Sequence, residues 1–72
     1  GRTVPAIVYK RRLHTINLFV WPSRQTGNRR VQKDGYSLDA WSRGGLRYTA
    51  VSDIAPADLE AFRKAFVAGS GG

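Results

Sequence analysis

The chain has 72 residues, the size of one small domain with a thin core. It contains no cysteine, which excludes disulfide staples, thiolate nucleophiles and thiolate metal ligands. Twelve Lys and Arg against five Asp and Glu give a net charge of +7, which favours an anionic partner such as nucleic acid, lipid headgroups or an acidic protein surface.

The charge is uneven along the chain. Residues 1–47 carry ten basic and two acidic side chains, or +8, whereas residues 48–72 carry two basic and three acidic ones, or −1. The longest apolar stretch, residues 16–21, is far shorter than the about 20 residues that cross a bilayer. Because the chain also lacks methionine, we expect a piece of a longer protein.

Two segments near the start have strand character. Residues 6–10 (AIVYK) and 14–21 (HTINLFVW) are rich in β-branched and aromatic residues, and Pro22 ends the second segment. They are close enough in sequence to form a hairpin. Residues 23–34 are polar, basic and without a period, which predicts a flexible surface loop.

The second half predicts another hairpin and a helix. Residues 36–41 and 46–51 alternate like strands, and residues 42–45 (SRGG) supply a tight turn between them. Pro56 suits the first turn of a helix, and Leu59, Phe62 and Phe66 recur at helical spacing.

Together these elements predict one α+β domain over residues 1–72. Its fold is a four-stranded antiparallel sheet of two hairpins, with one C-terminal helix packed on one face. We expect an ordered core over about residues 4–67 and a disordered tail over residues 68–72.

A single helix covers only one face of such a sheet, so the other face becomes the candidate binding surface. Alternation groups small aliphatic residues, including Ile16, Leu18, Leu38 and Ala40, on the face that suits the helix. An exposed aromatic patch often marks an interaction site, although such rings also stack on one another in sheets without further purpose. The candidate partner- or ligand-binding residues on the opposite face are Tyr9, Phe19, Trp21, Trp41 and Arg47.

No motif for catalysis or cofactor binding is found. His14 is the only histidine and has no cluster of ligands around it, so no metal site is expected. Gly44 and Gly45 lie between two strands and not before a helix, which excludes a phosphate-binding loop. There is no nucleophile elbow. We therefore expect a binding protein without cofactor, and not an enzyme.

Three segments carry a resemblance to a known family: residues 8–22 (VYKRRLHTINLFVWP), 35–53 (GYSLDAWSRGGLRYTAVSD) and 57–66 (ADLEAFRKAF). They resemble the C-terminal domain of transmembrane anti-sigma factors, also called transmembrane transcriptional regulators, of Gram-negative bacteria. The resemblance implies a periplasmic domain, a membrane span before it and a cytoplasmic domain that binds a sigma factor. The periplasmic partner is then an unidentified protein, ligand or lipid surface, or the domain shields a proteolytic cleavage site.

Two other classes of function stay open at this point. The basic half of the chain is compatible with a small nucleic-acid-binding module, although no known reading element is present. The aromatic face is also compatible with a homodimer interface.

Overall fold

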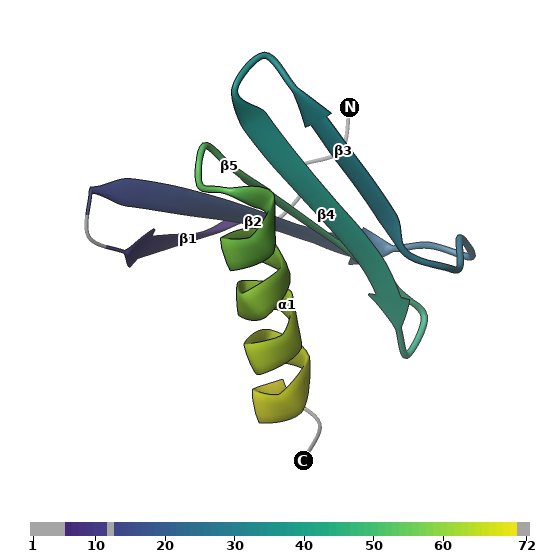
Figure 1. Cartoon of the computed structure of the whole chain (residues 1–72). Helices are drawn as coiled ribbons and strands as arrows, with labels where there is room; N and C mark the ends of the chain where they lie inside the picture. Colours follow the sequence, from purple (N-terminus) through teal and green to yellow (C-terminus); the bar gives the residue numbers. More distant parts are fainter. Residues whose placement is uncertain (1–5, 12, 71–72) are drawn as a thin grey trace.

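The computed structural model describes residues 6–11 and 13–70, which form one antiparallel sheet with one helix against it (Figure 1). The order across the sheet is β1-β2-β5-β4-β3. The predicted α+β class, antiparallel sheet and C-terminal helix are therefore confirmed. The elements are β1 (Ala6–Arg11), β2 (His14–Pro22), β3 (Arg29–Lys33), β4 (Tyr36–Arg43), β5 (Leu46–Ser52) and α1 (Pro56–Ser70).

The sheet has five strands, so the expected four strands in two hairpins are wrong. The expected loop over residues 23–34 holds only in its first half, because Arg29–Lys33 form the edge strand β3 and pair with β4 along their whole length. All five residues of β3 are exposed, so its sequence lacks the alternation of buried apolar and exposed polar residues that predicts a strand.

Two short turns set the register on either side of β4. Asp34 and Gly35 have φ of 53° and 79° and join β3 to β4. Gly44 and Gly45, with φ of 59° and 79°, join β4 to β5 as predicted. Two consecutive residues with positive φ give the twist that a two-residue hairpin needs.

The helix begins where the sequence indicates. Pro56 occupies the first helical position, where the absence of its N–H costs nothing. The carbonyl of Ala55 accepts hydrogen bonds from the amides of Asp58 (2.9 Å) and Leu59 (3.1 Å). The helix runs to Ser70, beyond the core boundary expected at residue 67, and Arg43 Nη1 donates to the carbonyl of Val67 at 3.0 Å. Residues 4, 5, 71 and 72, at the two expected ends, lie outside the described residues.

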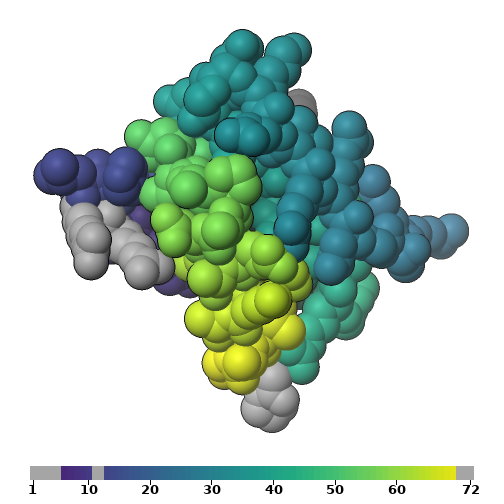
Figure 2. All heavy atoms as spheres, in the orientation of Figure 1, coloured from purple at the N-terminus to yellow at the C-terminus, as the bar shows by residue number. Residues whose placement is uncertain are grey.

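The core lies between α1 and one face of the sheet. Leu18 and Ala50 are opposite each other on β2 and β5, and both are fully buried. From the helix, Leu59 is buried, and Phe62 and Phe66 are half-buried, which confirms the predicted apolar stripe. In the space-filling view, α1 covers the middle of this face, with the β1–β2 hairpin on one side and β3 and β4 on the other (Figure 2).

Candidate binding surface

The strand register settles which side chains share a face, because directly paired residues project to the same side of a sheet. Leu18, Ala50 and Asp39 form one paired row on the helix side, and Val20, Tyr48 and Trp41 form the next. We call the opposite side the open face. Its residues include Val8, Lys10, Asn17, Phe19, Trp21, Arg29, Val31, Lys33, Leu38, Ala40, Arg47, Thr49 and Val51.

Three of the five candidate residues lie on the open face. Phe19 and Trp21 project from β2 and are half-buried, and Arg47 projects from β5. Arg47 is only 3% exposed, which the sequence did not indicate for a charged residue.

The placement of Trp41 and Tyr9 on the open face is wrong. Trp41 is 3% exposed on the helix side, where it stacks on Tyr48 (centroids 5.5 Å apart, planes 4° apart) and meets the edge of Phe66 at 5.9 Å. Tyr9 also lies on the helix side, against Phe62 at 5.1 Å. The open face therefore carries one tryptophan, not two, among the described residues.

In β1 the register places Tyr9 on the helix side, because Tyr9 pairs with Ile16, which is buried there. In β4 the helix side gains the packing of Trp41 and an ion pair. Alternation along β4 keeps Asp39 and Trp41 together, and a carboxylate normally faces water. Here Arg63 of α1 donates from Nε to Asp39 Oδ2 at 3.0 Å, and the Asp39 side chain is 3% exposed. Because its charge is paired, Asp39 can face the helix together with Trp41. Leu38 and Ala40, expected to face the helix, are consequently on the open face.

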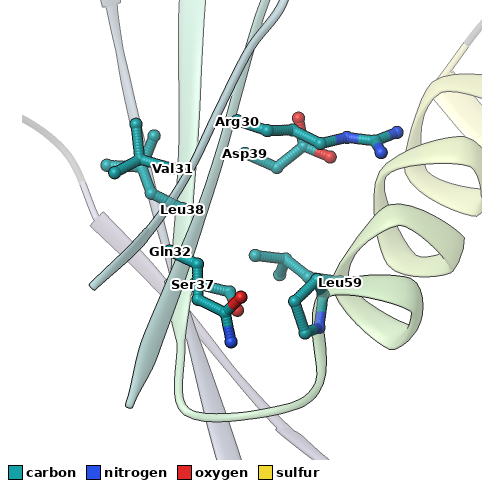
Figure 3. A pocket seen from close by; sticks show the side chains of 8 residues that line it. Arg30, Val31, Gln32, Ser37, Leu38, Asp39 and Leu59 are labelled. Atoms are coloured by element: carbon teal, nitrogen blue, oxygen red, sulfur yellow. The ribbon is translucent and has the colours of Figure 1, made fainter. Parts of the chain in front are cut away.

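The helix side has its own hollow of about 240 Å³ between β3, β4 and α1. Arg30 and Asp39 point towards α1, whereas Val31 and Leu38 point away from it (Figure 3). Arg30 Nη2 pairs with Glu60 Oε1 at 2.6 Å, and the hydrogen bond from Arg30 holds the pKa of Glu60 below its ordinary value. The cations here are paired with carboxylates, so this hollow offers little to an anionic partner.

Residues 23–28, which connect β2 to β3, cover one end of the open face. Ser23 N donates to the carbonyl of Gly45 at 3.0 Å, and Ser42 Oγ donates to the carbonyl of Gln25 at 2.6 Å. Arg47 Nη1 donates to the carbonyl of Gly27 at 2.6 Å. This segment, which we call the loop roof, is thus fixed to the end of the β4–β5 hairpin.

A groove of about 370 Å³ lies beside the loop roof. Its walls come from the loop roof and four strands, and its floor is largely small or aliphatic. Ala40 and Thr49 follow Arg29 in one paired row, Arg47 lies two residues before Thr49 on β5, and the small side chains of Ala40 and Thr49 leave the surface hollow. The lining residues are Trp21, Gln25, Arg29, Val31, Leu38, Ala40, Arg47 and Thr49.

The charges are sorted between the two sides of the sheet. Among the described strand positions, the charged residues of the open face are all basic: Lys10, Arg29, Lys33 and Arg47. Asp39 and Glu60 lie on the helix side, where Arg30, Arg63 and Lys64 pair with them. Within the described residues, none of the open-face cations makes an ion pair. The open face is therefore the electropositive side.

The sequence prediction missed Arg29, Val31 and Gln25, because all three fall in the segment expected to be a flexible loop. A signal for them existed. Asp34-Gly35 is a strong two-residue hairpin signal and is followed by the alternating strand β4, so the residues before it have to pair with β4.

The described residues contain no cluster of three or more His, Cys, Asp and Glu side chains that could hold a metal ion. Nor does α1, the helix of the described chain, have the length and apolar character needed to cross a membrane. His14 Nδ1 lies 3.1 Å from Asp53 Oδ1, in an exposed pair. Comparisons with models of known protein families, with curated proteins and with solved structures each found no match.

Proposed function

We propose that the chain is a binding module that uses the open face, and that it serves as the extracytoplasmic regulatory domain of a membrane-anchored anti-sigma factor. The observation that carries the binding role is the groove of the open face, which combines Trp21 with two arginines that no carboxylate of the described chain neutralises. Buried charges in proteins are usually paired, so an unpaired one beside a groove suggests a missing partner.

The regulatory part of the proposal is supported by the resemblance noted above. The three segments that carry it cover the second half of β1 with β2, the β4–β5 hairpin and most of α1. In this proposal the domain lies in the periplasm. Binding of a protein, ligand or lipid surface to the open face changes the affinity of the cytoplasmic domain for its sigma factor.

The test uses the complete reading frame that encodes this chain. A C-terminal alkaline phosphatase fusion is expected to be active and a β-galactosidase fusion inactive, because the proposal places the domain outside the cytoplasm. Lys33→Gln on the open face is expected to change transcription from the sigma-dependent promoter. Lys64→Gln on the exposed side of α1 removes the same charge and serves as the matched control.

An active β-galactosidase fusion would contradict the periplasmic placement. Equal promoter activity in the parent and in Lys33→Gln and Trp21→Ala variants, at equal protein levels, would contradict the role of the open face.

A further inference from the structure

The groove contains a buried cation that no carboxylate of the described residues neutralises. Arg47 is 3% exposed, and its Nη1 donates to the carbonyl of Gly27 and to Ser42 Oγ (2.9 Å), both of which are neutral acceptors. Its other guanidinium N–H groups donate to no acceptor in the described part of the chain. A guanidinium presents its donors in a planar fork that fits a carboxylate or phosphate oxygen pair.

A second cation lies across the groove. Arg29 projects from β3 and is exposed, and its side chain makes no hydrogen bond or ion pair within the described residues. Val31 and Leu38, paired across β3 and β4, form an apolar surface next to it. The groove therefore combines two anion-binding groups with an apolar surface.

We propose that this groove binds an acidic peptide segment of a partner protein, with one carboxylate on Arg47, a second on Arg29 and an apolar side chain against Val31 and Leu38. The proposal rests on the proposed function, because it names the partner of the open face. The site is concave and about 370 Å³ in volume, the size of a few side chains, and Arg47 is recessed beneath the loop roof. A bilayer surface or a duplex backbone, being broad, reaches such a recessed group poorly.

The register sets the spacing of the recognised groups. Val31 and Leu38 form one paired row, Arg29 lies in the next row, and Arg47 lies in the row after that. An extended segment that lies over the groove along β4 presents alternate side chains to the sheet. A Glu-x-Glu-x-apolar segment therefore places its three recognised side chains over Arg47, Arg29 and the apolar pair, in that order.

The probe is the fluorescently labelled peptide acetyl-Glu-Ser-Glu-Ser-Leu-amide, titrated at about 0.15 M salt, where the Debye length is about 8 Å, and followed by fluorescence anisotropy. Its partner probe has Gln in place of both Glu residues. We expect the Glu peptide to bind at least about tenfold more tightly than the Gln peptide, the loss typical of removing a charge-assisted hydrogen bond. Arg29→Gln is expected to weaken binding of the Glu peptide by about three- to fivefold, because an exposed ion pair contributes less than a buried one.

Arg30→Gln is the matched control, since it removes the same charge from the adjacent residue on the helix side. It is expected to change affinity less than about twofold, as distant exposed charges are screened. Both variants leave Arg47 and its loop contacts in place, so neither depends on how well an Arg47 variant folds.

Equal affinities for the two peptides, or equal losses in Arg29→Gln and Arg30→Gln, would overturn the proposal. Vesicles of phosphatidylcholine and phosphatidylglycerol and a short DNA duplex are the other arms. Binding to either of them without binding to the Glu peptide would also overturn it. The promoter and fusion assays decide the proposed function separately.

Discussion

At the scale of single residues, the two tryptophans show how the face of a strand decides a side chain's role. Trp41 is sealed between Tyr48 and Phe66 on the helix side, so its ring contributes packing and is out of reach of a partner. Trp21 projects to the open face and lines the groove, half-exposed to solvent. The same residue type is therefore structural in one strand and available for recognition in the next.

We expect Trp41→Ala to cost about 3 to 5 kcal/mol of the free energy of unfolding, the usual effect of truncating a buried large aromatic residue. A domain of this size rarely exceeds about 5 kcal/mol in total, so the variant should be mostly unfolded at room temperature. Urea unfolding followed by circular dichroism checks this. Trp21→Ala, the control, is expected to lose less than half as much, and an equal loss in both variants would contradict the assignment of faces.

At the scale of elements, the loop roof is held by side chains of the β4–β5 hairpin more than by its own backbone. Ser42 has two roles there, because its hydroxyl donates to the carbonyl of Gln25 and accepts from Arg47 Nη1. The segment from residue 23 to residue 28 is thus ordered through residues far away in sequence. The composition of this segment does not predict that dependence.

Replacing this hydroxyl tests the dependence. We expect Ser42→Ala to cost about 1 to 2 kcal/mol, because it removes two hydrogen bonds and leaves part of Arg47 unsatisfied. Amide hydrogen exchange, measured by NMR, should become faster at Ser23 and Gln25, the loop-roof amides with a known acceptor, and stay slow in β2 and β5. Unchanged exchange in the loop roof would show that other contacts hold it.

The contact between α1 and β3 predicts a dependence on pH. The hydrogen bond from Arg30 lowers the pKa of Glu60, and the charges of Arg30 and Lys64 act in the same direction. A carboxyl group with a lower pKa in the folded state stabilises the fold fully above its ordinary pKa of about 4.3. This contribution is lost as the pH falls through the lower, folded-state value.

The wild-type chain should therefore lose more stability than Glu60→Gln when the pH is lowered from neutral to about 3. The urea midpoint, measured across this range for both proteins, gives the comparison. If the two midpoints fall in parallel, the interaction between Glu60 and Arg30 does not stabilise the folded chain.

At the scale of the whole molecule, the sequence predicted the framework well because that framework depends on local signals. Alternation in β2, β4 and β5, the Gly44-Gly45 turn and the helical spacing of Leu59 and Phe62 are all properties of short segments. The helix covers one face of the sheet, as expected when the sequence predicts one amphipathic helix.

The parts that failed depend on contacts between distant segments. Alternation divides β4 into two sets of side chains but does not say which set meets the helix, because that choice depends on contacts with α1, such as Asp39 with Arg63 and Trp41 with Phe66. Likewise, β3 has no buried side chain of its own, so only its pairing with β4 makes it a strand. The groove combines both effects, since Arg29 comes from β3 and Leu38 from the inverted face of β4.

A chemical-shift map of the ¹⁵N-labelled chain with the Glu peptide tests directly whether the open face is the binding surface. We expect shifts at the Trp21 indole N–H, at the Arg47 Nε–H and in the amides of residues 25–33, with the exposed side of α1 unaffected. Shifts confined to α1, or spread evenly over both sides of the sheet, would contradict it.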